Sequence, residues 1–172
     1  TPHFMYNTLN SIKFAAFLKG EKELAGLIGD FVELLQASIN KKGSFLSVAD
    51  EIHILKNYIH LQDFRYQGSF QVKYEISEEA YRCYIPRLIL QPLVENAVKH
   101  GIGEKEDGGT LSISTYKEDK YIIIEICDYG IGFDTENTNF KGNGKSHIGI
   151  ANIRTRLSQL PGCSLDIKST PG

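Results

Sequence analysis

The stretch Pro86-Arg-Leu-Ile-Leu-Gln-Pro-Leu-Val-Glu-Asn-Ala-Val-Lys-His-Gly-Ile102 combines an apolar stripe with an unusually polar opposite side. At 100° per residue it predicts a helix with two faces. Pro86 suits the first turn of this helix and Gly101 its end, while Pro92 either kinks it or marks its true start. The apolar face comprises Leu90, Leu93, Val94, Ala97 and Val98, and the polar face Glu95, Asn96, Lys99 and His100.

The polar face offers an amide, an ammonium group and an imidazole close to a glycine-rich end. Such groups can hold a cation and anionic oxygens together, as a metal-nucleotide site requires. A surface helix whose polar side is merely solvated produces the same pattern. This stretch alone therefore leaves both interpretations open.

The composition is that of an ordinary soluble globular protein, large enough to bury a core. The 172 residues are 41% hydrophobic and 23% charged, which suits one large domain or two small ones. The net charge of −2 provides no attraction for nucleic acid, and no basic run with interleaved aromatic residues is present. We therefore expect no nucleic-acid partner.

The cysteines and histidines predict neither disulfides nor structural zinc. Cys83, Cys127 and Cys163 are widely separated, and the five histidines form no tight ligand cluster. No apolar run is long enough to span a bilayer. The chain starts within a helical pattern and without methionine, so we expect a fragment of a longer protein, attached to a membrane only through segments absent from it.

The first third of the chain has helical periodicity. One run extends from Thr1 to about Lys19, and a second stops at Lys41-Lys42-Gly43. Ser47-Val-Ala-Asp50 resembles a capping box and opens a third helix. The short connection around Gly43 favours an antiparallel hairpin, whose apolar stripes are too extensive for one copy to bury. We therefore predict a homodimer that pairs two hairpins into a four-helix bundle.

After Gly68 the pattern changes to strands and helices that suggest an α/β sandwich with one mixed sheet. The predicted fold is thus α+β, with a helical domain at residues 1–67 and a sandwich domain at residues 68–172. The predicted strands are 70–76, 110–116, 121–127 and 164–168, with a hairpin connection at 118–120 and a helix at 147–160.

The segment Asp128-Tyr-Gly-Ile-Gly-Phe-Asp134 follows a buried strand and carries a second candidate for ligand binding. Gly130 and Gly132 let the backbone approach a ligand, and a fixed carboxylate accepts a hydrogen bond from an exocyclic amine. A simple turn has the same glycine spacing. The polar run 135–146, which includes Gly144, fits a lid or a disordered loop, and the helix that follows offers amide groups for phosphate.

Four motifs occur in an order that resembles the LytS/YehU-type sensor histidine kinases, and the resemblance covers nearly the whole chain. They look like the H, N, G1 and G2 boxes of that family. The four segments are Pro2-His3-Phe-Met-Tyr-Asn-Thr-Leu-Asn10, Leu90-Gln-Pro-Leu-Val-Glu-Asn-Ala-Val-Lys-His-Gly101, Asp128-Tyr-Gly-Ile-Gly132 and Gly149-Ile-Ala-Asn-Ile-Arg-Thr-Arg-Leu157.

The resemblance implies a role for each matching position. His3 would be the phosphoacceptor, Asn96 the ligand of the ATP-bound Mg²⁺, and Asp128 the acceptor of the adenine amino group. The remaining nucleotide-binding positions would be Lys99 and His100 near the phosphates, Gly130 and Gly132 in the G1 box, Gly144 in the lid, and Gly149 at the helix start beyond it.

The resemblance also implies an activity and a setting. Residues 1–67 would dimerise and carry the phosphoacceptor, and residues 68–172 would form the ATPase sandwich shared by gyrase, heat-shock chaperone, histidine kinase and mismatch-repair proteins. ATP and Mg²⁺ would be the cofactors, and a response regulator receiver domain would accept the phosphoryl group on an aspartate. The chain would belong to the cytoplasmic part of a bacterial inner-membrane protein.

The chemistry expected of His3 defines what its surroundings must provide. A neutral imidazole nitrogen attacks the γ-phosphorus in line, so the ring must be exposed and the attacking nitrogen unprotonated. Asn7, one helical turn on, can orient the ring or touch the incoming phosphate. Phe4 follows His3 where many other histidine kinases have an acid, and Glu95 is our candidate for a base instead.

Two alternatives stay open at the level of the sequence. His147 stands where the family often has another glycine, which fits a catalytically weak ATP-binding scaffold that dimerises and transmits conformation. Nucleotide binding without phosphotransfer would favour that scaffold. An ATPase or serine kinase on the same sandwich is disfavoured by the helical hairpin and by His3.

Overall fold

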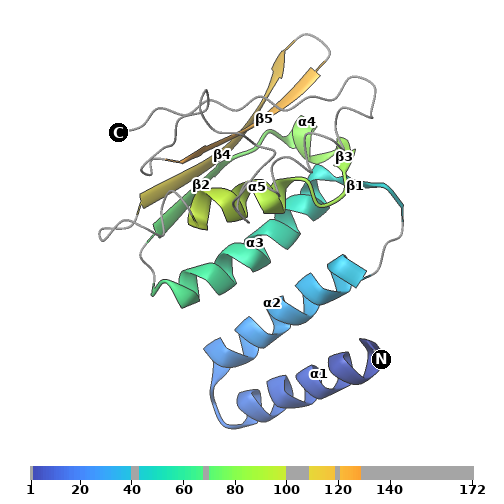
Figure 1. The fold of residues 1–172 in the computed structure, drawn as a ribbon, viewed down its shortest axis with the longest axis vertical. Coiled ribbons are helices and arrows are strands. Elements are labelled where there is room, and N and C mark those ends of the chain that lie inside the picture. The colour runs from blue at the N-terminus through green and yellow to red at the C-terminus, as the bar shows by residue number, and fades with distance from the viewer. Residues whose placement is uncertain (1, 40–42, 68–69, 100–108, 119–120, 129–172) are drawn as a thin grey trace, which may run out of the picture.

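The computed structural model describes residues 2–39, 43–67, 70–99, 109–118 and 121–128. Helices come first and a sheet-containing unit follows, which confirms the predicted α+β class (Figure 1). The helices are α1 (Pro2–Leu18), α2 (Lys22–Ile39), α3 (Val48–Arg65), α4 (Glu78–Tyr81) and α5 (Leu90–Ala97), and the strands are β1 (Phe45–Ser47), β2 (Phe70–Glu75), β3 (Tyr84–Pro86), β4 (Gly109–Glu118) and β5 (Tyr121–Asp128).

The helices α1 and α2 lie side by side and are joined by a tight turn at Gly20 (Figure 1). Gly20 has a φ of 83°, a left-handed conformation that glycine adopts without the steric penalty of a Cβ. Its amide donates to the carbonyl of Phe17 at 3.0 Å and ends α1. Gly20 therefore forms the turn between α1 and α2.

The helix α3 begins where the capping pattern predicts. The Ser47 hydroxyl accepts a hydrogen bond from the backbone N–H of Asp50 at 3.1 Å. The apolar face of α3 is buried together with side chains of α5 and β4 in one core. The buried members of this core are Val48, Ile52, Leu55, Ile59, Ile89, Leu90, Val94, Ala97, Val98, Leu111 and Ile113.

The burial of α3 matters for the division of the chain into domains. The predicted boundary between residues 67 and 68 falls after α3, whereas the side chains of α3 share a core with the sheet. The same helix also contacts α2, and it lies between α2 and the sheet (Figure 1). The helix α3 is therefore the element through which the hairpin and the sheet unit meet.

The larger sheet of the described residues has the strand order β2-β4-β5 and is mixed, as predicted. The strand β2 runs parallel to β4, and β4 pairs antiparallel with β5 so that Glu118 faces Tyr121 across the predicted hairpin. Leu111, Ile113 and Thr115 alternate with more exposed residues and point into the core. The helices α3 and α5 cover one face of this sheet (Figure 1).

A small antiparallel pair of strands, β1 and β3, precedes α5 and corrects one prediction. Pro86 was expected in the first turn of the helix, but it lies in β3 opposite Phe45. A proline suits a short edge strand because the missing N–H removes no interior ladder bond. The helix starts at Leu90, so Pro92 lies in its first turn and marks its true start. The predicted elements at 147–160 and 164–168 lie outside the described residues.

Candidate functional site

The candidate phosphoacceptor His3 is exposed near the start of α1. Its Nδ1 atom lies 3.3 Å from the side-chain Nδ2 of Asn7, one helical turn further along. In this arrangement the amide N–H₂ donates to an unprotonated Nδ1, whereas a turned amide would present its oxygen to a protonated Nδ1. The contact thus holds one ring nitrogen and leaves Nε2 free to meet a substrate.

The helix α5 presents the candidate metal ligand beside the core. Leu90, Val94 and Ala97 are buried, whereas Glu95 is exposed and Asn96 is half-buried. The side-chain Oδ1 of Asn96 is buried and has no hydrogen-bond partner among the described residues. An amide oxygen in that situation fits a ligand for a hard cation such as Mg²⁺.

The acidic and histidine side chains of the described residues form no cluster of three or more that would hold a metal ion. A bound nucleotide could bring further oxygens to a cation at Asn96. Nucleotide phosphates commonly complete the coordination of Mg²⁺ in this way. Lys99, one turn beyond Glu95, is exposed and adds a positive charge at the same end of α5.

The surroundings of Glu95 include the phenol of Tyr58 on α3. Burial raises the pKa of Tyr58 well above its usual range, and the negative charge of Glu95 raises it further. Tyr58 therefore remains a neutral phenol throughout the physiological range. Together with Tyr66 it packs against the core, as expected for a residue with a packing role.

The nucleotide-side positions are only partly within the described residues. Asp128 is the last residue of β5 and pairs with Leu111 of β4, and α5 packs against β5. The structure therefore brings the elements that carry Asn96 and Asp128 into one unit. The predicted positions His100, Gly130, Gly132, Gly144 and Gly149 lie outside the described residues.

The structure does not bring His3 and Asn96 together. The helix α1 packs on α2, and α5 packs on α3, so α2 and α3 lie between the two residues (Figure 1). Glu95, our sequence-based candidate for the base, is on α5 and is separated from His3 in the same way. Phosphotransfer to His3 therefore requires an arrangement other than the one observed.

Polar contacts between α2 and α3 connect the hairpin to the sheet unit. Glu33 Oε2 lies 2.8 Å from His53 Nε2 and accepts a hydrogen bond from Asn57 Nδ2 at 2.6 Å. His60 bonds through Nδ1 to the carboxylate of Asp30. Both histidines are exposed and pair with α2 of their own chain.

These contacts also affect the titration of Glu33. The hydrogen bond from Asn57 lowers the pKa of Glu33 below its usual value, and the bond with His53 lowers it further. The folded protein thus favours the ionised carboxylate at this position. We call Asp30, Glu33, His53, Asn57 and His60 the α2–α3 polar contact.

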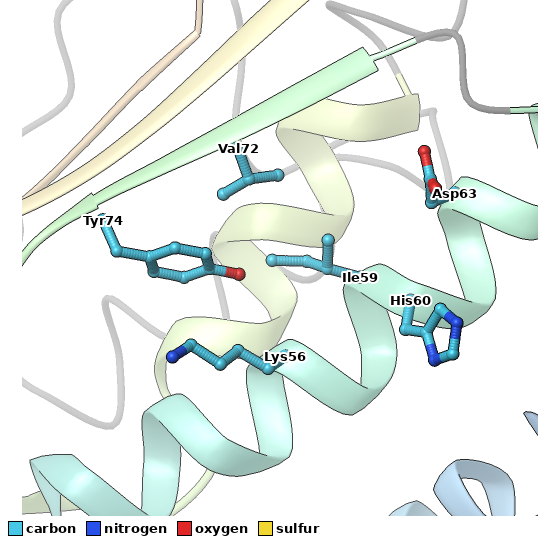
Figure 2. A pocket seen from close by; sticks show the side chains of 6 residues that line it. All are labelled: Lys56, Ile59, His60, Asp63, Val72 and Tyr74. Atoms are coloured by element: carbon cyan, nitrogen blue, oxygen red, sulfur yellow. The ribbon is translucent and has the colours of Figure 1, made fainter. Parts of the chain in front are cut away.

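An open pocket of about 260 Å³ lies between α3 and β2 (Figure 2). It contains none of the predicted site residues, and its lining residues are Lys56, Ile59, His60, Asp63, Val72 and Tyr74. The Lys56 ammonium lies 4.9 Å from the centre of the Tyr74 ring, and burial raises the pKa of Tyr74 to about 12. Lys56 and Tyr74 thus interact with each other, and His60 pairs with Asp30, which lies outside the pocket.

Sequence reasoning missed one buried acid, Glu51 on α3. It is 2% exposed, and its carboxylate oxygens accept hydrogen bonds from the backbone N–H groups of Leu88 and Leu90, each at 3.1 Å. The sequence did carry one sign of its burial, because Glu51 lies three residues after Val48 and four before Leu55. That spacing places an acid within the apolar stripe of α3, where an unpaired charge is costly.

Comparison with known proteins identifies the class. Residues 1–70 match the family model described as histidine kinase, and residues 85–172 match the histidine kinase-, DNA gyrase B- and HSP90-like ATPase model. The chain therefore belongs to the histidine kinase family, and the ATPase match implies ATP binding by its second part. This agrees with the four motifs and with the resemblance drawn from them.

Several individual relatives are named as sensor histidine kinases. The chain is 32% identical to the sensor histidine kinase YesM of Bacillus subtilis over 91% of its length, and 32% identical to BtsS of Escherichia coli over 86%. It spans only 27% and 26% of those relatives. YpdA of Escherichia coli is also 32% identical, over 97% of this chain and 30% of that protein.

Solved structures support the fold independently. The histidine kinase AdeS of Acinetobacter baumannii superposes with a TM-score of 0.56 at 19% identity, covering 99% of this chain and 90% of that one. The histidine kinase domain of a blue-light activated kinase of Erythrobacter litoralis gives 0.54 at 10% identity, covering 94% and 79%. No helix among the described residues is long and apolar enough to cross a bilayer.

Proposed function

We propose that this chain is the kinase core of a two-component sensor, which transfers the γ-phosphoryl group of ATP to His3 and then to an aspartate of a response regulator receiver domain. The observation that carries the proposal is the exposed His3 imidazole, held through Nδ1 by Asn7 on the first helix of a histidine kinase hairpin. The relatives named as sensor histidine kinases support it.

The proposed reaction is an in-line displacement at phosphorus. The lone pair of an unprotonated ring nitrogen of His3 attacks the γ-phosphorus, and an N–P bond forms. The bond from that phosphorus to the β,γ-bridging oxygen breaks, ADP leaves with the electron pair, and the ring gives its remaining proton to solvent. Mg²⁺ held by Asn96 and the phosphate oxygens would neutralise charge that develops on the nucleotide.

The residues of the ATP site divide the binding of the nucleotide between them. Asn96 would hold the cation through its Oδ1, and Lys99 and His100 would contribute charge near the phosphates. Asp128 would accept the adenine amino group, and Gly130, Gly132, Gly144 and Gly149 would give backbone access and form the lid. The Oδ1 of Asn96, buried and without a hydrogen-bond partner among the described residues, supports the role of Asn96.

The proposed assembly is a homodimer through the α1–α2 hairpin. Apolar side chains on both helices of the hairpin are exposed in the single chain, including Met5, Ile12 and Phe31. A second copy would cover them in a four-helix bundle. The helices α2 and α3 separate His3 from Asn96. Phosphorylation of His3 would therefore need either a movement of the ATP-binding part relative to its own hairpin or ATP bound to the second protomer.

The proposed setting is the cytoplasmic side of a bacterial membrane, where ATP and receiver domains are available. The relatives are named as sensors, and this chain corresponds to roughly a quarter of their length. Sensing and membrane attachment would then be functions of segments outside the present sequence.

The test is incubation of the purified chain with γ-labelled ATP and Mg²⁺, followed by exposure of the labelled protein to acid and to alkali. We expect a label that is labile in acid and stable in alkali, as for phosphohistidine. His3→Gln should abolish it, and Asn96→Ala should reduce it by at least about 10²-fold, since cation positioning supplies most of the rate. His53→Gln, which removes another exposed histidine, is the matched control and should retain the label.

Three outcomes would contradict the proposal. Failure to bind Mg-ATP would remove the kinase assignment altogether. A label that survives His3→Gln would place the phosphoryl group elsewhere, and an acid-stable label would indicate a hydroxyl acceptor. Tight nucleotide binding without any label would favour the ATP-binding scaffold instead.

A further inference from the structure

We propose that Glu51 is a positioning residue for the candidate nucleotide site, which fixes the start of α5 from α3 and thereby the place of Asn96. The inference rests on the proposed function, and nothing in the motif pattern assigns a role to this acid. Glu51 is 2% exposed and belongs to α3, whereas it accepts hydrogen bonds from Leu88, just before α5, and from Leu90, the first residue of α5.

The helix α5 lacks a cap of its own. The residue before it, Ile89, has no side-chain oxygen, and no side-chain hydrogen bond from that position caps the helix. The first N–H groups of a helix have no partner within it and need an acceptor when they are buried. Glu51 supplies that acceptor from another helix, since its Oε1 receives the N–H of Leu90 at 3.1 Å.

The second carboxylate oxygen holds a strained residue. Leu88 has a φ of 54°, in the left-handed region that a bulky side chain rarely adopts. Its N–H donates to Glu51 Oε2 at 3.1 Å. Strain of this kind persists where the surroundings over-determine the conformation. Glu51 therefore fixes both the direction in which the chain enters α5 and the first residue of the helix.

The neighbouring residue ties the same segment to the hairpin. Arg87 donates through its Nη2 to the carbonyl of Ala37 near the end of α2 at 3.0 Å, and its backbone N–H donates to the carbonyl of Ser44 at 3.0 Å. The turn before α5 is thus held from two sides, by α3 through Glu51 and by the end of α2 through Arg87. Its position depends on side chains that lie outside it.

The position of Asn96 follows from the start of the helix. Asn96 is six residues after Leu90 on a helix of eight residues, a separation of about 9 Å along the axis. A helix this short moves as one piece, and a shift of one residue in its register would rotate Asn96 by about 100°. The buried Oδ1 of Asn96 would then leave the place that makes it a candidate ligand.

The experiment measures how much Mg²⁺ strengthens nucleotide binding. The affinity of the chain for the β,γ-imido analogue of ATP is measured in the presence of Mg²⁺ and, separately, in EDTA. We call the ratio of these two affinities the magnesium gain. The variants are Glu51→Gln, Asn96→Ala and the double variant. Asp50→Asn is the matched control, because it removes the same charge from the neighbouring, exposed position of α3.

We expect Glu51→Gln to lower the magnesium gain by about 10-fold or more, which is the effect of losing a group that orients a metal ligand. Binding in EDTA should change by less than about 2-fold, and Asp50→Asn should match the wild type. The double variant should be no worse than Asn96→Ala alone, because both changes remove the same interaction.

The proposal is overturned if Glu51→Gln weakens binding of the analogue equally with and without Mg²⁺. It is also overturned if the double variant lowers the magnesium gain by the product of the two single effects. Either result would assign Glu51 a purely structural role. A wild-type chain that binds no nucleotide at all would instead refute the proposed function, and this inference with it.

A measurement on the wild type covers the case in which Glu51→Gln does not fold. Amide hydrogen exchange at Leu88 and Leu90 should slow when the analogue binds with Mg²⁺, relative to the analogue in EDTA, because occupation of Asn96 stabilises the start of its helix. Equal exchange in the two conditions would overturn the coupling between Glu51 and Asn96.

Discussion

The contact between His3 and Asn7 determines which nitrogen of the imidazole is free to react. If the Asn7 amide oxygen faces Nδ1, the ring carries its proton there and Nε2 keeps a lone pair for attack on phosphorus. If the amide N–H₂ faces Nδ1, the proton lies on Nε2 and the exposed nitrogen is not nucleophilic. The structure places Nδ2 of Asn7 3.3 Å from Nδ1, which is the second orientation, so phosphorylation at Nε2 requires the amide to turn and present its oxygen to Nδ1.

Substitution of Asn7 separates its two possible roles. Asn7→Asp keeps an oxygen that accepts from Nδ1 and adds a negative charge, whereas Asn7→Leu removes the acceptor. If Asn7 orients the ring, Asn7→Asp should retain phosphohistidine formation and Asn7→Leu should lower its initial rate by about 10-fold or more. The rates are measured with labelled ATP, and the tautomer by nitrogen chemical shifts of the ring.

The alternative role predicts the opposite order. A side chain that touches the incoming phosphate would lose most activity on Asn7→Asp, because the new carboxylate repels the phosphate oxygens. The substitution Asn10→Asp, on the same helix and also exposed, controls for the added charge. An activity of Asn7→Asp at or below that of Asn7→Leu would contradict the orienting role.

At the scale of the elements, the α2–α3 polar contact holds the hairpin against the sheet unit. Most of its groups are exposed, and exposed ion pairs contribute little. Asn57 is the exception, since it is 7% exposed and its amide donates to Glu33. Loss of that acceptor leaves a buried donor unpaired, so Glu33 is the residue of the contact that matters most for stability.

We expect Glu33→Ala to destabilise the chain by about 1–3 kcal/mol, the usual cost of an unpaired buried polar group. The pKa of Glu33 is lower in the folded state than its usual value of 4.5, so its contribution is complete above that pH and is lost as the pH falls through the folded value. Denaturant unfolding at pH 7 and at pH 3 should therefore show a larger difference between wild type and variant at pH 7.

The control for this prediction is Gln36→Ala, which changes another exposed residue on α2. It should leave stability within about 0.5 kcal/mol at both pH values, as is usual for surface substitutions. A Glu33→Ala effect that is the same at pH 3 and pH 7 would show that the folded protein does not favour the ionised carboxylate.

The elements also show which features could be predicted from the sequence. The sequences of β2 and β4 alternate apolar and polar residues, and that of β5 is largely apolar, so these strands could be predicted. The helix cap at Ser47 could be predicted because its signal lies within four consecutive residues. The pairing of β1 with β3 joins segments about forty residues apart and has no local signal. The start of α5 was placed too early for the same reason, since Glu51 from another helix provides its cap.

The same limit applies to the candidate site. His3, Asn96 and Asp128 could be named because each belongs to a short motif of fixed spacing. The role of Glu51 depends on a contact across more than thirty residues, and only its place in an apolar stripe distinguishes it. The separation of His3 from Asn96 is a property of how α2 packs on α3, which periodicity does not specify.

At the scale of the whole molecule, the α1–α2 hairpin leaves much of its apolar surface uncovered. On α1, Ala16 is buried and Leu9 is half-buried, whereas Met5 and Ile12 are 46% and 49% exposed. Other large exposed side chains on the two helices are Phe4, Phe14, Phe17, Leu18, Leu24, Phe31 and Ile39. Apolar surface of this extent marks an interaction site.

The hairpin surface predicts that the chain is a dimer and that Ile12→Glu disrupts it. A glutamate at that position would place an unpaired charge in the apolar seam between two copies, and we expect the dissociation constant to rise by at least about 100-fold. Analytical ultracentrifugation over a range of concentrations measures this. Phe64→Glu, at an exposed aromatic residue on α3, is the matched control and should leave the dimer intact. Circular dichroism confirms that both variants remain folded, and a dimer constant unchanged by Ile12→Glu would exclude this face of α1 from the interface.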